Sequence, residues 1–311
     1  MSKQKYRLVT RSDFDGLICA VLLRELDLIN KIRFVHPKDM QEGKISINVN
    51  DITTNLPYVP GAHLVFDHHL SETIRVSGKH PDNHILDPNA PSAARVVYDY
   101  YGGKDTFPNV SEEMINAVDK ADSAQFSREE ILFPKGWVLL NYLMDPRSGL
   151  GRFKQFRISN YDLMMVLIDY CKKHSIDEIL ELPDVKERVD LYLEHQRTSL
   201  NQIEKCSKIY KNVVVLDLRN EEEIFTSNRF VIYALYSECN ISIHVLWGLQ
   251  KQNTVLAVGK SILDRSSKTN IGELMLKYRG GGHEKAGTCQ IPNDRADQVL
   301  QEIIKKINED G

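Results

Sequence analysis

The chain lacks paired cysteine motifs, long hydrophobic runs and a secretory leader. Its cysteines number five, an odd count, and they show no C-x-x-C spacing, which argues against a disulfide framework and against structural zinc. The longest apolar runs, LICAVLL and LMMVLI, are far too short to span a bilayer. The polar start carries no hydrophobic region of a signal peptide. We therefore expect a cytoplasmic protein that does not bind membranes.

The chain also lacks a strong excess of charge of either sign. The formal net charge is -3, from 40 basic and 43 acidic residues. Such a balance provides no global field that would attract a long nucleic acid, so any nucleic-acid substrate should be short. The length of 311 residues exceeds what one hydrophobic core usually serves, and two domains are the default expectation.

Strand-like and helix-like patterns alternate in the first 125 residues. The predicted strands lie at 6–10, 32–36, 45–50 and 63–67, and the first predicted helices at 16–28 and 92–101. Strands that alternate with helices predict a parallel sheet. Helical periodicity then dominates to about residue 207 and includes one long helix that begins near Pro183. The predicted fold class is α/β, with domains at 1–125 and 208–311 and a helical connector at 126–207.

Acidic residues and histidines stand where the apolar runs of the first domain stop. They are Asp13 and Asp15 in TRSDFDG, Asp51 in NVNDITT, Asp67, His68 and His69 in VFDHH, and Asp122 in DKADSAQF. In an open parallel sheet such positions meet at the carboxyl ends of the strands. Carboxylates mixed with imidazole suit a pair of Mn²⁺ or Mg²⁺ ions, and the histidines favour manganese. The pattern predicts a two-metal hydrolase of phosphate esters.

Two further segments have a functional and a structural interpretation. In Gly280-Gly281-Gly282-His283 the glycines allow backbone N–H groups to approach an anion, and the histidine could donate to a phosphate oxygen. The same segment could be an ordinary helix end and turn. A basic cluster, Arg147, Arg152, Lys154 and Arg157, is compatible with a phosphate groove or with a solvated face.

The order of these motifs resembles the DHH phosphoesterase superfamily: D-x-D, a following Asp, D-H-H, a later Asp, and GGGH-x-x-A-G. The resemblance is strongest to the branch of nanoRNases, cyclic-dinucleotide phosphodiesterases and exopolyphosphatase-like proteins. It covers essentially the whole chain. It implies that residues 1–125 form the catalytic metal-binding domain, that residues 208–311 form the DHH-associated substrate-binding domain, and that the active-site cleft lies between them.

The resemblance also implies roles for single residues. Asp13 would bind the first metal, and Asp51 would bridge both metals. The second metal would be bound by Asp15, His68 and Asp122. His69 would orient a metal-bound phosphate, with Asp67 supporting the histidines. In the second domain, the substrate would be bound by Arg265, Ser266, Gly280, Gly281, Gly282 and His283. The sequence leaves open whether Asp119 also binds metal.

One position departs from the family pattern. The family usually has a histidine four residues before the first Asp, and this chain has Val9 there. The first metal should therefore bind more weakly, or another residue should replace the imidazole. His36, at the end of the second predicted strand, is the candidate. Arg11 places a fixed cation beside two carboxylates, where it could serve as a surrogate charge or as a phosphate ligand.

The leading functional hypothesis is an Mn²⁺-dependent phosphodiesterase that converts nanoRNA or linear or cyclic dinucleotides to mononucleotides. An exopolyphosphatase, or another phosphoanhydride hydrolase, is the alternative within enzymes. A nucleotide-sensing binding protein with an impaired metal site is the alternative of another class. The sequence leaves a homodimer open.

Overall fold

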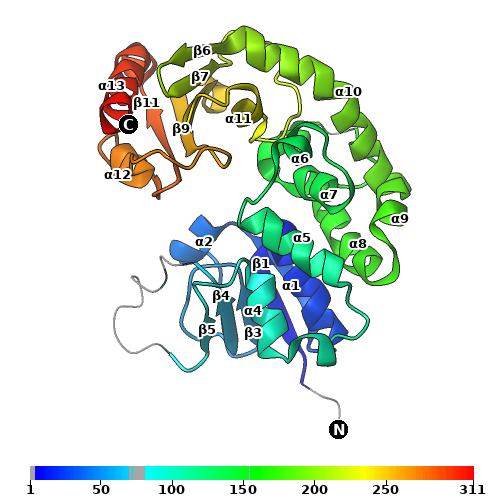
Figure 1. Ribbon diagram of the computed structural model, residues 1–311. Helices are drawn as coiled ribbons and strands as arrows, with labels where there is room; N and C mark the ends of the chain where they lie inside the picture. Colours follow the sequence, from blue (N-terminus) through cyan, green and yellow to red (C-terminus); the bar gives the residue numbers. More distant parts are fainter. Residues whose placement is uncertain (1–3, 70–71, 73–80, 154) are drawn as a thin grey trace. The chain divides into compact units, whose positions relative to one another are not determined.

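The computed structural model describes residues 4–69, 72, 81–153 and 155–311, and it contains two compact units (Figure 1). The first unit comprises Met1–Gln125, Lys135–Pro146 and Leu150–Asp190, and the second comprises Phe126–Pro134, Arg147–Gly149 and Leu191–Gly311. Among the described residues, no helix is both long enough and apolar enough to cross a membrane.

The first unit is built on a five-stranded sheet in which all neighbouring strands are parallel. Its order is β2-β1-β3-β4-β5, with β1 at Tyr6–Arg11, β2 at Ile29–Val35, β3 at Asp51–Thr54, β4 at Leu64–Asp67 and β5 at His84–Leu86. From β1 the chain places β2 on one side and β3, β4 and β5 on the other, so the strand order reverses between β1 and β3. Open α/β sheets bind their ligands beside such a reversal, outside the carboxyl ends of the strands. This sheet confirms the predicted α/β class and fixes the edge at which a site is expected.

Helix α1 (Phe14–Glu25) of the first unit is buried along most of its length. Further helices of this unit are α2 (Pro37–Gln41), α4 (Ala93–Tyr100), α5 (Glu112–Asp122), α7 (Gly136–Met144), α8 (Asn160–Lys173) and α9 (Ile176–Glu181). Helix α1 packs against α4, α5 and α8. The turn from β1 into α1 requires Gly16, because a Cβ there would lie 2.0 Å from the carbonyl oxygen of Arg11. This turn holds the residues between β1 and α1 close to the end of the strand.

The third strand differs from the prediction. Residues 45–50 form no strand, although ISINVN has an alternating pattern, and β3 begins at Asp51. Asp51 is paired in register with Arg7, near the start of β1. Its carboxylate accepts hydrogen bonds from the Arg7 Nε (2.7 Å) and Nη2 (2.8 Å) and from the Asn48 backbone N–H (2.8 Å). Asp51 therefore lies at the amino ends of the parallel strands, which is the opposite edge from the one predicted.

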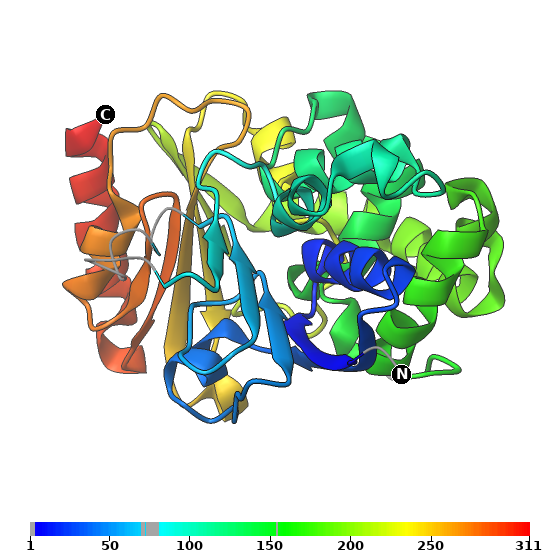
Figure 2. The same cartoon turned by 90° about the horizontal axis from the view of Figure 1, so that it is seen from below.

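The second unit contains a six-stranded mixed sheet of order β10-β11-β9-β8-β7-β6. The strands are β6 (Ser207–Tyr210), β7 (Val213–Asp217), β8 (Ile241–Trp247), β9 (Thr254–Lys260), β10 (Gly281–His283) and β11 (Ala286–Ile291). Strands β8 and β9 pair in antiparallel orientation. Helices α12 (Ile271–Leu276) and α13 (Ala296–Asp310) lie along one face of this sheet, in orange and red in Figure 2, and share its apolar core.

The remaining described helices are short, apart from one long helix that belongs to both units. In the second unit they are α6 (Arg128–Leu132) and α11 (Val231–Leu235), and short 3-10 helices occur at Gly103–Asp105, Pro146–Ser148, Leu150–Arg152, Leu249–Lys251 and Asn293–Arg295. The long helix predicted from Pro183 is α10 (Pro183–Cys206), whose first part belongs to the first unit and whose remainder belongs to the second.

Candidate metal centre

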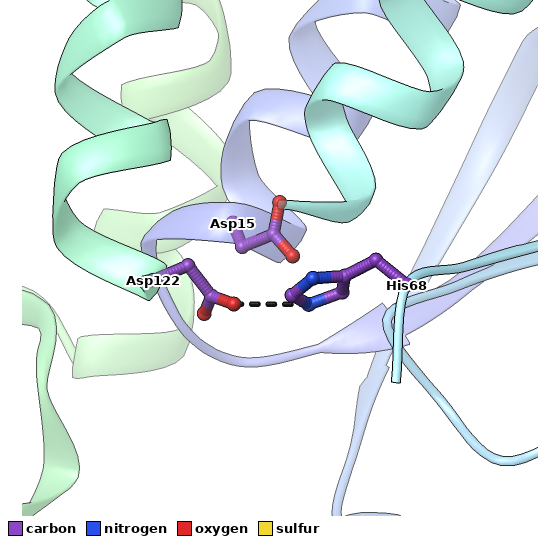
Figure 3. Close-up of side chains that lie close together, drawn as sticks. All are labelled: Asp15, His68 and Asp122. Atoms are coloured by element: carbon purple, nitrogen blue, oxygen red, sulfur yellow. Dashed lines mark ion pairs between the residues drawn. The ribbon is translucent and has the colours of Figure 1, made fainter. Parts of the chain in front are cut away.

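Three predicted ligands gather at the carboxyl edge of the parallel sheet. Asp15 lies in the first turn of α1, His68 directly follows β4, and Asp122 is the last residue of α5. One ligand atom from each of these residues lies within 4.8 Å of the others, and Figure 3 shows the three side chains facing one another. Among the described residues this is the one group of at least three acidic, histidine or cysteine side chains so arranged.

Asp15 is held by the amino end of a neighbouring helix. Its carboxylate accepts the backbone N–H groups of Ala94 (2.7 Å) and Ala93 (3.0 Å), the first two residues of α4. A helix amino terminus favours a negative charge at this place. Burial nevertheless raises the pKa of Asp15 to about 7, and the negative charge of Asp122 adds to the effect. A divalent cation would reverse this shift, because it supplies the missing positive charge.

His68 is oriented through one ring nitrogen and presents the other to Asp122. Its Nδ1 lies 3.2 Å from the carbonyl oxygen of Ala90, to which an Nδ1–H can donate. Its Nε2 lies 2.9 Å from the Asp122 Oδ2, yet it is buried without a hydrogen bond of acceptable geometry. Metal-binding histidines commonly have one nitrogen fixed by a carbonyl while the other faces the ion. This arrangement fits a divalent cation held by one imidazole and two carboxylates.

The ionisation of His68 and Asp122 reflects their mutual contact. Burial opposes a charged imidazole, but contact with Asp122 and the charge of Asp15 outweigh it and raise the pKa of His68 to about 9. Burial likewise opposes a charged Asp122, but His68, His69 and Arg11 outweigh it and lower the pKa of Asp122.

Asp67 and His69, the first and last residues of the DHH motif, contact each other directly. One oxygen of Asp67, Oδ1, accepts the backbone N–H groups of His68 (2.8 Å) and His69 (3.2 Å) and contacts the His69 Nδ1 at 2.6 Å. Burial opposes a charged ring, but the hydrogen bond to Asp67 outweighs it and raises the pKa of His69. The His69 side chain is 42% exposed, whereas that of Asp67 is buried. His69 can therefore present its Nε2 to a ligand while Asp67 fixes the ring.

Asp13 is near these groups but is bound by the protein itself. It is the N-cap of α1, and its Oδ1 accepts the Gly16 backbone N–H (3.0 Å) and the Asn55 Nδ2 (3.1 Å). Its Oδ2 forms an ion pair with the Arg11 Nε at 2.9 Å. Asp13 does not belong to the group formed by Asp15, His68 and Asp122.

Three other residues considered as metal ligands make structural contacts instead. Asp51 lies at the far edge of the sheet in its ion pair with Arg7, so the prediction that it bridges two metals is wrong. His36 is exposed and is the N-cap of α2, where its Nδ1 accepts the Lys38 backbone N–H. Asp119 accepts hydrogen bonds from Ser92 and Arg95, which link α5 to α4.

Asn55 was not among the residues predicted from the sequence to belong to the site. It directly follows β3 at the carboxyl edge and is 1% exposed. Its Nδ2 donates to Asp13, whereas its Oδ1 is buried without a hydrogen-bond partner. The signal that could have found it is the run Ile52-Thr53-Thr54, because β-branched residues favour a strand that ends at Thr54 rather than at Asn50.

The predicted substrate-binding segments lie within the second unit and are exposed except for the half-buried Gly280. The Arg265 Nε donates to the carbonyl oxygen of Ile262, and the Ser266 Oγ accepts from the Asn240 Nδ2. Gly281, Gly282 and His283 form the edge strand β10. The interpretation as a simple helix end is therefore incomplete, since the glycines continue into a strand.

The two segments are joined by one lysine. The Lys260 Nζ donates both to the carbonyl oxygen of Ser267 and to the Glu284 Oε1, each at 3.3 Å. The loop that carries Arg265 and Ser266 is thereby held near the turn that follows β10.

The basic cluster predicted at 147–157 does not form one described group. Lys154 lies outside the described residues. Arg147 belongs to the second unit, whereas Arg152 and Arg157 belong to the first. The Arg157 Nε lies 3.6 Å from the Asp184 Oδ1, so its charge is partly balanced by an acid.

Comparison with known proteins identifies a relative of high similarity. The pGpG-specific phosphodiesterase PggH from Vibrio cholerae is 63% identical in sequence, with 99% of this chain and 100% of that chain covered and a TM-score of 0.88. RecJ from Thermus thermophilus, in its complexes with Mn²⁺ and with Mg²⁺, is 12% and 13% identical, and the alignments cover 98% of this chain and 52% and 50% of RecJ. The TM-scores of 0.53 and 0.51 show a shared fold. No family model and no curated protein sequence matches the chain.

Proposed function

Because the chain belongs to the DHH phosphoesterase superfamily and is a hydrolase of phosphate esters, we propose that it cleaves pGpG and related short linear dinucleotides into mononucleotides. The observation that carries the proposal is the 63% identity with a pGpG-specific phosphodiesterase, which extends over the full length of that enzyme. The chemistry is the addition of one water molecule across the phosphodiester bond.

The proposed catalytic residues at the carboxyl edge of the sheet have two roles, metal binding and phosphate binding. Asp15, His68 and Asp122 would hold a divalent cation, whose contribution when bound is to acidify a water molecule and offset phosphate charge. His69, fixed by Asp67 through its Nδ1, would donate from its Nε2 to a phosphate oxygen. Because that histidine is already oriented, little reorganisation is needed when the negative charge of the phosphate increases in the transition state.

The donor set supports Mn²⁺ as the preferred ion. Two carboxylates and one imidazole suit both Mg²⁺ and Mn²⁺, but imidazole binds manganese better than magnesium. Mg²⁺ would be the weaker substitute.

The second unit would recognise the nucleotide part of the substrate. We assign this task to the exposed Arg265 and Ser266 and to the segment from Gly280 to His283, which Lys260 holds in one place. An arginine can bind a terminal phosphate through two parallel hydrogen bonds.

The direct test is hydrolysis of two substrates by the purified protein with Mn²⁺ or Mg²⁺. We expect pGpG to be converted to mononucleotide with a kcat/KM on the order of 10²-fold or more above that for polyphosphate, because a site built for a base and sugar loses those contacts with polyphosphate. Faster hydrolysis of long polyphosphate would favour the exopolyphosphatase alternative. Tight binding of pGpG without turnover would favour a nucleotide sensor.

Replacement of Arg265 tests the assignment of substrate binding. Arg265→Ala should raise the KM for pGpG by roughly 10- to 100-fold, since a lost hydrogen bond to a charged group costs about 1.5–3 kcal/mol. Activity on bis-(p-nitrophenyl) phosphate, which has no nucleotide to bind, should change little. Lys305→Ala, a charge removal on the exposed face of α13, is the matched control. Equal losses on both substrates would contradict a role in nucleotide recognition.

A further inference from the structure

The carboxyl edge of β1 and β3 is the place where a second ion beside the first would need its ligands. Asp13 is the acid nearest to this place, and both of its carboxylate oxygens already have partners. Oδ1 accepts two hydrogen bonds, from Gly16 and Asn55, and Oδ2 is paired with Arg11. A cation bound by Asp13 would have to share Oδ2 with the guanidinium of Arg11, whereas the oxygens of Asp15 are shared only with neutral backbone N–H groups.

Among the described residues, the other positions at the ends of β1 and β3 add no charged oxygen ligand. At the end of β3, Asn55 offers a neutral amide, and its Nδ2 donor points to Asp13. Its buried Oδ1 is a single uncharged oxygen, which is a weak basis for a divalent ion that prefers several charged oxygen ligands. Val9 is fully buried and packs with Val35, Met40 and Leu56, so it belongs to the apolar core beneath this edge. The residues present therefore do not fit a second divalent ion.

A permanent positive charge already stands at this place. Guanidinium groups carry a fixed positive charge, and the pairing of the Arg11 side chain with Asp13 fixes its position. Its side chain is 35% exposed, so its remaining N–H donors can reach a ligand. Arg11 also acts electrostatically on Asp122, which places it at the same site as the group Asp15, His68 and Asp122. A divalent ion added here would be repelled by the guanidinium.

We infer that this phosphodiesterase uses one divalent cation per active site and that the guanidinium of Arg11, anchored on Asp13, takes the place of a second ion. This inference deepens the proposed function and rests on it. Asp15, His68 and Asp122 hold the cation. Arg11 donates to the phosphate oxygens and neutralises the charge that develops on them, as arginines do in other phosphoryl-transfer sites. Asn55 positions the pair, because its amide holds the Asp13 carboxylate that anchors Arg11.

The first experiment counts the ions without reference to turnover. Titration of the metal-free protein with Mn²⁺, followed by electron paramagnetic resonance of the free ion and by native mass spectrometry, should give one ion per chain. Asp122→Asn should remove this ion, whereas Asp13→Asn should leave the count at one. Two ions of comparable affinity in the wild-type protein would overturn the inference.

The second experiment attempts to build the missing site. In the double variant Arg11→Ser with Asn55→Asp, the guanidinium is removed and a carboxylate is supplied next to Asp13, so the count should rise to two ions per chain. Arg33→Ala, which removes an exposed arginine from β2, should leave it at one. A circular dichroism spectrum and melting curve of each variant show whether the fold is retained. A folded double variant that still binds one ion would argue against Arg11 as the occupant of the second place.

The third experiment tests the chemistry of Arg11. With pGpG and saturating Mn²⁺, Arg11→Ala should lower kcat by roughly 10²–10³-fold, the loss typical for one donor to a developing oxyanion. Free guanidinium ion in the buffer should restore part of this activity, which a purely structural role would not produce. No rescue, together with an unchanged kcat, would exclude the role. If the wild-type protein binds one ion but does not hydrolyse pGpG, the proposed function fails and the ion count stands.

Discussion

Asp15→Asn should abolish metal binding and lower the turnover of pGpG by more than the roughly 10–100-fold that changes in the outer shell of a metal site cost. Asp15 combines three properties that no substitute retains together: it is buried, it is negatively charged, and both its oxygens accept N–H groups from the start of α4. An asparagine keeps the shape but loses the charge, and its NH₂ group would face a backbone N–H.

The measurement for Asp15→Asn is Mn²⁺ affinity by calorimetry together with single-turnover hydrolysis of pGpG. Asp169→Asn is a matched control, because Asp169 is an acid of α8 in the same unit that pairs only at the surface with Arg24. The control should keep wild-type affinity and rate. If Asp15→Asn binds Mn²⁺ with wild-type affinity, the group of Asp15, His68 and Asp122 is not the metal site.

Asp51→Asn should do the reverse: it should destabilise the fold and leave metal binding unchanged. Asp51 is 1% exposed and neutralises Arg7 through two hydrogen bonds. Breaking a buried ion pair leaves an uncompensated charge and costs about 3–5 kcal/mol, and the partial exposure of Arg7 reduces this to about 2–3 kcal/mol. Urea denaturation should show this loss of unfolding free energy, while the Mn²⁺ titration of the folded variant should match that of the wild type.

The predicted bridging role gives the opposite outcome for Asp51→Asn. If Asp51 held two ions, the variant would lose affinity and turnover while keeping its stability. A folded Asp51→Asn protein of normal stability with impaired Mn²⁺ binding would therefore contradict the placement of Asp51 at the amino edge of the sheet.

The contrast between Asp15 and Asp51 marks what the sequence could predict. The first and fourth strands have apolar runs that end at the motif itself, so their carboxyl ends, and hence Asp15 and His68, could be placed from pattern alone. The third strand could not. ISINVN alternates more regularly than DITT, but β3 is set by its pairing between β1 and β4, and such pairing is a tertiary effect that overrides local pattern.

Because the third strand was predicted at 45–50 rather than at Asp51–Thr54, Asp51 was predicted at the carboxyl edge of the sheet rather than at the amino edge. The same error hid Asn55, whose importance appears only when its contact with Asp13 is known. The substitution of Val9 for the family histidine was visible in the sequence, and so was Arg11. Their relation was not, because the ion pair between Arg11 and Asp13 depends on the turn that Gly16 allows.

The hydrogen bonds from α4 to Asp15 have a consequence for folding. The three proposed metal ligands come from positions 15, 68 and 122, and Asp15 is oriented by residues 93 and 94, so the group forms only when these distant segments of the first unit are folded together. An ion that binds the folded chain alone raises its apparent stability by about 2.7 kcal/mol when the free ion is at 100 times its Kd. A cation bound at this site would therefore stabilise the folded first unit, and we expect removal of the metal to lower the apparent stability of the protein as well as its activity.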